Sequence, residues 1–451
     1  MTAHILLRGC RTDCRYQLGS VPFITEVVLV WLTAVAASIL LNAVSDAAEG
    51  EDAAPGVLAE APIEQECPIL LRVRVQPKNS GRVSTGPERT YCMLLDTGAD
   101  RTCFDVRHRG LLGDATSTYE TSNAFGSAVT EAYESPVMQL GEVSIHPTTR
   151  VACIDLQWFS DGIGEQVDGL LGMDALREFV ISIDFDARKL QFHRAARPDF
   201  GRCVPITWRG EFGAERPFVE AAFEDGVTET FLIDTAAIGN FSATLNSTVY
   251  DGLVKKGILA RVEGAHLARG SARLITMSGT GDVTVARAKF LTLAGFSLKQ
   301  LVVYPHPRVS TLGLSYLSRY SVEFDFPNGV MYLCPSERFV RPDVWYDLTS
   351  FGVLKRDDGA VVETVRSDGW GANAGIKQGD LILAINGRNL KGMSLFAIRR
   401  MLAVESRQAF EIRRHGVKRR IVLDVTREIQ RLLREGVEEV KETDSTKSRR
   451  N

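Results

Sequence analysis

Features that mark nucleic-acid-binding proteins, metalloenzymes and nucleotide-binding proteins are missing from this sequence. Its 451 residues carry 53 Lys and Arg against 56 Asp and Glu, a formal charge of −3, so there is no basic excess to attract nucleic acid. Zinc-ligand spacing, a phosphate-binding glycine loop and a Ser or Cys nucleophile motif are also lacking, and the seven His residues are scattered. The sequence therefore predicts no metal, no cofactor and no nucleic-acid partner.

A hydrophobic run long enough to span a membrane is lacking at the N-terminus. Val27–Leu41 is uncharged but only 15 residues long, whereas a membrane-spanning helix needs about 20. Arginines precede this run and small residues follow it, which is typical of a secretory signal. We expect residues 1–48 to be a signal peptide or an N-terminal membrane anchor, with a buried core helix as the remaining alternative. The first two predict an exported protein that is periplasmic, secreted or anchored on the outer side of a membrane.

Cysteine is sparse, with eight residues in the chain. Cys10 and Cys14 precede the hydrophobic run. An even number of cysteines in an exported protein permits disulfides, and six allow 15 pairings that sequence cannot choose between. Disulfides and buried free thiols both remain open for the six that follow the run: Cys67, Cys92, Cys103, Cys153, Cys203 and Cys334.

Two segments have the composition of solvated chain. Residues 49–66 carry six acids and no base among Ala and Pro, which predicts an acidic linker. Residues 426–451 are highly charged, and apolar residues recur at helical spacing between Arg427 and Glu442, which predicts a charged helical tail.

The most informative stretch is Tyr91–Asp100, in which an apolar run ends abruptly at Asp96, Thr97 and Gly98. A short apolar run bounded by glycine indicates a buried strand that enters a turn. A carboxylate at the end of such a strand is costly unless it is hydrogen-bonded or shares a proton. Asp96 is therefore expected to have a partner.

The sequence repeats this design once. Thr230–Ala237 is again an apolar run that ends in Asp-Thr, at Asp234 and Thr235. Gly172 follows Asp96 by 76 residues, and Gly313 follows Asp234 by 79. Each glycine precedes an apolar helix start and then a strand, at Ser182–Asp186 and Ser321–Asp325. The nearly constant offset indicates an internal duplication.

The D-T-G-A-D motif of Asp96–Asp100, followed by L-L-G and a short helix, resembles the retropepsin-like aspartic proteases. The duplication resembles the bilobal, pepsin-type arrangement within one chain. The resemblance covers roughly Cys67–Leu333 and implies two β-rich lobes, at residues 67–200 and 201–340, with an active cleft between them. In that family two carboxylates share a proton and activate a water molecule.

The resemblance also implies roles for individual residues. Asp96 and Asp234 would be catalytic, and the residues after each would support them. Two hairpin-like segments, Thr121–Thr130 and Ile275–Val285, would cover the cleft, although surface hairpins of no special role are the alternative. The implied supporting residues are Thr97, Gly98, Thr235 and Ala236, and the implied substrate-binding residues are Asp100, Phe125, Gly126, Ser278 and Gly279.

The second half departs from the family pattern. Ala236 stands where the family has glycine, and Ile238 stands at the position that matches Asp100. A methyl group at Ala236 could crowd the turn or the substrate, so the lobes are expected to be inequivalent. A catalytically weak or inactive peptide-binding protein of the same fold is therefore the alternative to an active protease.

A different composition begins after Tyr346. Ala374–Gly387, A-G-I-K-Q-G-D-L-I-L-A-I-N-G, resembles the PDZ domain, with Leu381–Ile385 as a strand and Asn386-Gly387 as a tight turn. The resemblance implies a domain over residues 347–425 that binds a peptide carboxyl terminus at a sheet edge, flanked by a helix at Ser394–Ala403. A purely structural β-domain is the alternative. The implied peptide-binding residues are Ser350, Phe351, Gly352 and Val353.

The expected fold is mainly β, with an aspartic-protease-like pair of β-barrel lobes followed by an α+β PDZ domain. The expected function is that of an exported aspartic endopeptidase. Its partners would be a protein or peptide substrate and a PDZ ligand peptide. Because both aspartates belong to one chain, a monomer is expected to suffice for catalysis.

Overall fold

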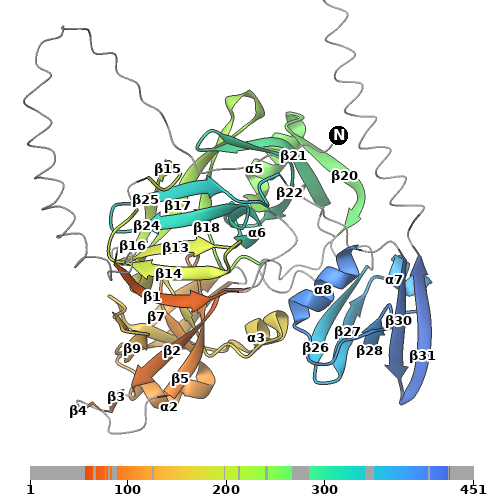
Figure 1. The fold of residues 1–451 in the computed structure, drawn as a ribbon, viewed down its shortest axis with the longest axis horizontal. Coiled ribbons are helices and arrows are strands. Elements are labelled where there is room, and N and C mark those ends of the chain that lie inside the picture. The colour runs from red at the N-terminus through yellow and green to blue at the C-terminus, as the bar shows by residue number, and fades with distance from the viewer. Residues whose placement is uncertain are drawn as a thin grey trace, which may run out of the picture. The chain divides into compact units, whose positions relative to one another are not determined.

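The computed structural model describes residues 56–63, 68–76, 78–79, 82–83, 89–123, 126–197, 199–211, 214–238, 242–266, 284–340, 350–404, 407–424 and 426. The predicted signal or anchor and the predicted charged tail beyond residue 426 lie outside these residues. The fold is mainly β (Figure 1).

No helix within the described ranges is both long and apolar enough to cross a membrane.

The first lobe is a sheet in which the strand before Asp96 is central. This strand, β5 (Arg89–Leu95), lies between β2 (Leu70–Gln76) and β12 (Gly169–Leu171) in the sheet. Its consecutive residues Tyr91–Leu95 are buried, so side chains on both faces of the strand are covered. Three short helices lie between strands: α2 (Arg109–Leu112), α3 (Gln157–Ile163) and α4 (Met173–Leu176). In order across the sheet, the strands are β10 (Val143–Ile145), β9 (Val137–Leu140), β2 (Leu70–Gln76), β5 (Arg89–Leu95), β12 (Gly169–Leu171), β6 (Cys103–Asp105), β11 (Val151–Ile154), β8 (Gly126–Tyr133) and β7 (Ser117–Asn123).

The second lobe repeats this plan. Asp234 follows β18, which pairs in parallel with β23, just as β5 pairs with β12. Two helices, α5 (Ser247–Lys255) and α6 (Leu314–Leu317), belong to this lobe. In order, its strands are β16 (Thr207–Glu211), β17 (Ala214–Phe223), β18 (Thr228–Ile233), β23 (Thr311–Leu312), β19 (Ala243–Asn246), β22 (Phe296–His306), β21 (Thr284–Leu293) and β20 (Leu259–His266).

A third sheet joins the two lobes. The strands predicted near Ser182 and Ser321 are β13 and β24, and they pair antiparallel with Ile183 opposite Val322. One hydrophobic core contains buried residues of both lobes. In order, the strands of this sheet are β1 (Val57–Pro62), β14 (Lys189–His193), β13 (Val180–Asp184), β24 (Tyr320–Asp325), β25 (Val330–Pro335) and β15 (Arg202–Pro205).

The prediction of an acidic linker over residues 49–66 is wrong for residues 57–62. Val57–Pro62 forms β1 and pairs with β14, with Ala61 opposite Leu190. Ala59 and Ala61 are buried while the residues between and after them face outward, so the segment has strand periodicity. Glu60 at an exposed position and the acids that flank the strand in the sequence concealed this pattern.

The five cysteines within the described residues form no disulfide with one another, which favours the second of the two alternatives considered above. Cys92, Cys103 and Cys153 are buried, Cys203 is exposed and Cys334 is half-buried. Burial raises the pKa of the Cys92 and Cys153 thiols. Cys67 lies outside the described residues.

The C-terminal domain has a core of its own. The predicted strand Leu381–Ile385 is β28, and the predicted tight turn is present, because Asn386 and Gly387 both have positive φ and Ile385 pairs with Arg388. The helices are α7 (Trp370–Asn373) and α8 (Leu395–Val404). In order, the strands are β26 (Phe351–Arg356), β27 (Gly359–Val365), β28 (Leu381–Ile385), β30 (Arg407–Arg414) and β31 (Val417–Asp424), with β29 (Arg388–Asn389) beside β28.

A small hairpin in the first lobe pairs β3 (Lys78–Asn79) with β4 (Arg82–Val83).

Candidate active site

The first turn of the site holds the carboxyl group of Asp96 at the end of β5. Its backbone N–H donates to Leu171 O at 3.0 Å, which fixes the turn against β12. The N–H groups of Gly98 and Ala99 both donate to Asp96 Oδ1 at 2.9 Å. Asp96 is buried, so these hydrogen bonds orient a carboxyl group that has little access to water.

The second turn has the same geometry. The N–H of Asp234 donates to Leu312 O at 3.1 Å. The N–H groups of Ala236 and Ala237 both donate to Asp234 Oδ1 at 2.8 Å. The duplication predicted from spacing therefore extends to individual hydrogen bonds.

Thr97 and Thr235 tie the two turns together across the lobes. Thr97 Oγ1 donates to Ile233 O at 2.8 Å, and Thr235 Oγ1 donates to Leu95 O at 2.7 Å. Each threonine N–H also donates to the hydroxyl of the other threonine, at 3.1 and 3.0 Å. Because both side chains are buried, this reciprocal set of four bonds fixes the separation of the two aspartates.

Gly98 brings the two turns into close contact. A Cβ atom at this position would lie 2.4 Å from Asp234 Cγ and 2.5 Å from its Oδ2, which leaves no room for a side chain. Ala236, at the equivalent position, carries a methyl group that is buried in the core. The two sides of the site therefore differ.

Burial and proximity change the protonation of the pair. Burial raises the pKa of Asp96 well above its usual range, and the charge of Asp234 raises it further. Burial likewise raises the pKa of Asp234, against the lowering effect of its backbone hydrogen bonds. The positive charge of Arg216 in β17 lowers both pKa values by a smaller amount. Two adjacent buried carboxyl groups of this kind are expected to share one proton.

Two charged residues near the site were not found from the sequence. Arg216 lies in β17, in a stretch that carries no motif. Asp174, in the first turn of α4, is buried and accepts hydrogen bonds at 2.7 Å from Thr102 N, Thr102 Oγ1 and Thr149 Oγ1. Burial raises the pKa of Asp174 to about 6. Its position two residues after Gly172 could have suggested a role.

The predicted substrate-binding residues are only partly described. Asp100 is exposed, and its carbonyl accepts a hydrogen bond from Asp174 N at 3.1 Å. Gly126 begins β8 and pairs with Asn123 of β7, so these strands form a hairpin at the predicted position. The predicted residues Phe125, Ser278 and Gly279 lie outside the described residues.

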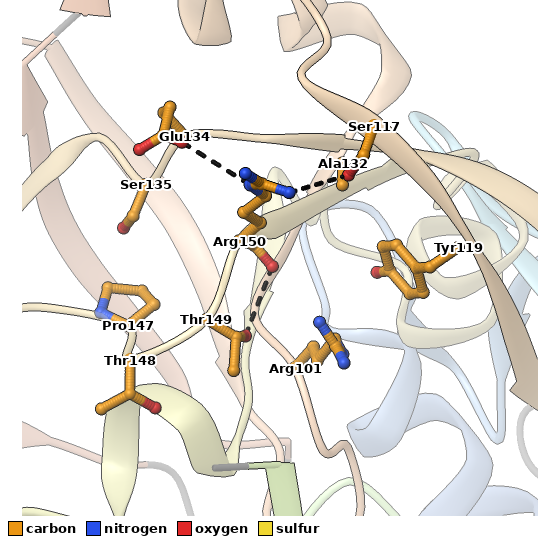
Figure 2. A pocket seen from close by; sticks show the side chains of 10 residues that line it. All are labelled: Arg101, Ser117, Tyr119, Ala132, Glu134, Ser135, Pro147, Thr148, Thr149 and Arg150. Carbon is orange, nitrogen blue, oxygen red and sulfur yellow. Dashed lines mark hydrogen bonds and ion pairs between the residues drawn. The ribbon is translucent and has the colours of Figure 1, made fainter. Parts of the chain in front are cut away.

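A cavity of about 480 Å³ lies beside this hairpin. Figure 2 shows the guanidinium of Arg101 next to Tyr119, and it lies 4.7 Å from the center of that ring. Arg150 also lines the cavity and contacts Glu134 and Ser117 (Figure 2). Neither aspartate lines this cavity, so it is separate from the carboxyl pair.

No group of three or more His, Cys, Asp or Glu side chains within the described ranges is arranged to hold a metal ion.

The C-terminal domain offers a second candidate site at the edge of its sheet. β26 pairs with β27 on one side, and the described strands place no neighbour on its other side. Ser350, just before β26, has a positive φ of 56°, and the register shifts between Gly352 and Val353. These features turn the chain at the start of an edge strand, where an extended peptide can add by backbone hydrogen bonds.

Residues 361–414 match the family described as PDZ domain. This segment is a PDZ domain. The match supports the binding of peptide ligands. The crystal structure of an aspartic proteinase from Irpex lacteus is similar to the chain with a TM-score of 0.39 and 14% identity, and covers 63% of this chain and 100% of that chain. No curated protein matches the chain.

The four residues predicted to bind the PDZ ligand lie together at the start of β26. The side chains of Phe351 and Val353 belong to the core of the PDZ domain. Ser350 is also buried. What these residues can present to a peptide is therefore backbone, as expected for strand addition.

Proposed function

We propose that this protein is an aspartic endopeptidase whose chemistry resides in the Asp96 and Asp234 carboxyl groups. The observation that carries this proposal is the reciprocal bracing of the two Asp-Thr turns. Each aspartate accepts two backbone N–H groups on one oxygen, which leaves the other oxygen to act on a water molecule and a substrate. Both aspartates come from one chain, so one copy supplies the complete pair.

The proposed reaction uses the proton that the pair shares. The ionised carboxylate takes a proton from a water molecule, which attacks the carbonyl carbon of the scissile peptide bond. The protonated carboxyl group donates its proton to the carbonyl oxygen as the tetrahedral intermediate forms. That intermediate collapses when the carboxyl group that took the proton from water donates it to the amide nitrogen, which leaves as an amine. A hydroxyl group of the intermediate returns its proton to the other carboxylate, so the carbonyl of the new carboxylic acid forms and the pair again holds one proton. No covalent intermediate with the protein is formed.

Ala236 stands where the family that the sequence resembles has glycine, and this difference favours a protein without catalytic activity. Its N–H nevertheless donates to Asp234 Oδ1 at 2.8 Å, as the N–H of Gly98 does to Asp96 Oδ1 at 2.9 Å. The alanine therefore keeps the hydrogen bond that the turn requires. This contact supports an active pair over a binding-only role.

The PDZ domain is proposed to bind carboxyl-terminal peptide segments at the edge of β26. Its own core does not include the aspartates, so it would supply binding and not chemistry. The proposal thus assigns the two activities to separate parts of the chain.

The test of the carboxyl pair is the replacement of each aspartate by its uncharged isostere. Asp96→Asn and Asp234→Asn should each lower the hydrolysis of a fluorogenic decapeptide library by about a hundredfold or more, because neither variant can share the proton. Asp114→Asn, at an exposed position in the first lobe, is the matched control and should retain wild-type turnover. Full turnover in Asp234→Asn would contradict the proposed mechanism.

A further inference from the structure

β26 and the helix α8 lie next to each other in the PDZ domain, and a peptide-binding groove would lie between them. A peptide that adds to β26 must run along this edge, with its carboxylate near the turn at Ser350. The opposite end of the groove lies near Lys355 in β26 and Leu395 at the start of α8. That end is where the residues upstream of a peptide carboxyl terminus would lie.

A turn of the first lobe contacts this end of the groove. The turn consists of residues 162–165, which are the last two residues of α3 and the two that follow the helix. Lys355 Nζ lies 3.1 Å from Glu165 Oε1. A Cβ atom on Gly164 would lie 2.6 Å from Leu395 Cβ and 3.2 Å from Lys355 Cβ. The turn therefore touches both walls of the groove, strand and helix, at the same place.

Arg399 connects the same turn to the edge of the strand. This residue lies in α8, one helical turn after Leu395, and its Nη1 donates to Gly162 O at 2.8 Å. Its Nη2 lies 3.4 Å from Val353 O, a carbonyl on the helix-facing side of β26. One guanidinium group thus links the first lobe to a backbone acceptor that an added peptide strand would use.

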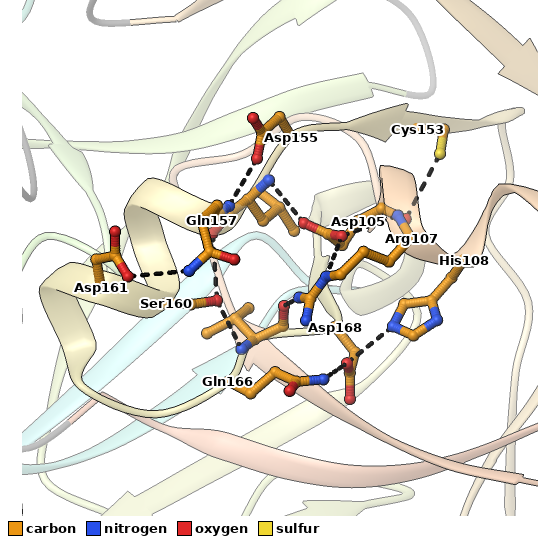
Figure 3. Close-up of polar contacts among 12 residues, drawn as sticks. Asp105, Arg107, His108, Cys153, Asp155, Gln157, Ser160, Asp161, Gln166 and Asp168 are labelled. Carbon is orange, nitrogen blue, oxygen red and sulfur yellow. Dashed lines mark hydrogen bonds and ion pairs between the residues drawn. The ribbon is translucent and has the colours of Figure 1, made fainter. Parts of the chain in front are cut away.

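The turn is held firmly on its own side, as Figure 3 shows for the contacts around α3. Asp105 Oδ2 accepts from Leu156 N at 2.8 Å before the helix, and Ser160 Oγ accepts from Val167 N at 3.0 Å after it. Asp168 then accepts from Cys92 N at 2.9 Å and lies 2.8 Å from His108 Nε2.

The chain continues directly from this network into the site. Asp168 precedes β12, and β12 pairs with β5, which carries Asp96 at its end. A movement of the turn would therefore act on the strand that positions Asp96.

We propose that the turn of residues 162–165 occupies the upstream end of the PDZ groove, so that a carboxyl-terminal peptide and this turn compete for the same place. This inference rests on the peptide-binding function proposed for the PDZ domain. Among the described residues, the contacts are the Arg399–Gly162 hydrogen bond, a partly exposed ion pair and apolar packing that includes Phe396 of α8 against the core of the lobes. The ion pair adds little because it is partly exposed, so a peptide with good backbone pairing can displace the turn. Peptide binding would thereby release the PDZ domain from the first lobe.

The test inserts a side chain at the contact. Gly164 is left-handed, with φ 75° and ψ 15°, a conformation that asparagine tolerates. Gly164→Asn should therefore keep the turn but push it away from Leu395. Gly226→Asn is the matched control, because Gly226 has a φ of 74° and open space around its Cβ position.

The probe is a fluorescein-labelled pool of decapeptides with nine random positions and a carboxyl-terminal Val, and an amidated pool reports dependence on the carboxylate. In the full-length chain, Gly164→Asn should bind the free-acid pool at least about fivefold more tightly than wild type, because a larger fraction of grooves is open. Gly226→Asn should bind like wild type. Equal binding by wild type and Gly164→Asn would overturn the competition.

A second set of variants does not depend on the fold of the Gly164 variant. Glu165→Lys should also tighten binding, and Lys355→Glu combined with it should return binding toward the wild-type level by restoring an ion pair. Absence of binding in every variant would refute both the competition and the peptide-binding role of the PDZ domain. The aspartate variants above test hydrolysis separately, so failure here leaves the catalytic proposal standing.

Discussion

At the scale of single residues, Asp174 is a buried acid whose ionised form is costly. Burial raises its pKa from 3.8 to about 6, although three hydrogen bonds oppose this effect. A raised pKa means that the folded state holds the proton more tightly than the unfolded state. The stabilisation of the folded state by the proton on Asp174 is fully present below about pH 4 and is lost as the pH rises through about 6.

We therefore expect Asp174→Asn to stabilise the protein above pH 7 and to have little effect near pH 4. The asparagine oxygen can still accept from Thr102, and its amide can donate to the hydroxyl of Thr149. From the shift in pKa, the gain at pH 8 is on the order of 3 kcal/mol. Urea unfolding at pH 4.5 and pH 8 measures it, and a variant that is less stable at both values would contradict this account.

The sequence predicted the residues whose role depends on a local motif. Asp96, Thr97 and Gly98 lie in one short segment, and the structure places them in one turn. The duplication located Asp234 and Thr235 in the same way. Arg216 and Asp174 were missed because their importance depends on which strands and turns lie next to them, and no local pattern records that.

At the scale of the elements, the two turns depend on each other through threonine. Thr97 Oγ1 donates to Ile233 O and accepts from Thr235 N, so its loss leaves two buried backbone groups without these bonds.

Thr97→Val keeps the shape of the side chain but removes the hydroxyl. Each unsatisfied buried group costs about 1–3 kcal/mol, so the two together are expected to lower the free energy of unfolding by about 2–6 kcal/mol. Hydrolysis should fall as well, because the aspartates are no longer held at a fixed separation. Thr97→Ser retains the hydroxyl and should lose less than half as much stability. Urea denaturation compares the three proteins, and equal stability of the valine and serine variants would count against the bracing role.

Strands were predicted correctly where a short apolar run and the turn residues at its end indicate the same element. β5 and β28 each consist of a short apolar run that ends at a turn, and both are present. β1 was missed because its buried positions are small alanines on either side of Glu60, within a segment rich in acids. The joining sheet was missed for another reason: pairing between β13 and β24 is a contact between distant segments, which the period of either segment does not reveal.

At the scale of the whole molecule, the buried apolar residues in the described ranges form two hydrophobic cores. One runs through both lobes and includes Ile183 in β13, whereas the other fills the PDZ domain and includes Ile382 in β28. Both isoleucines are almost fully buried, with exposed fractions of 1% and 0%. The lobes share a sheet, so they are expected to unfold together, and the PDZ domain is expected to unfold in a transition of its own.

Matched substitutions in the two cores test this division. Ile183→Ala and Ile382→Ala should each cost about 2–5 kcal/mol, because each removes buried methyl and methylene groups from a packed core. The same cost shifts the melting temperature by about 4–8 °C per kcal/mol in a domain of the size of the PDZ domain, and by about half as much in a unit as large as the two lobes. Calorimetry should therefore show two transitions. Ile382→Ala should lower the melting temperature of the PDZ transition and leave that of the lobes in place. This shift should be larger than the one that Ile183→Ala produces in the transition of the lobes. If Ile382→Ala lowered the temperatures of both transitions equally, the PDZ domain and the lobes would unfold as one cooperative unit. The contact at residues 162–165 would then couple the two cores. A peptide that displaced this turn would have to disrupt more of the structure than the contact alone.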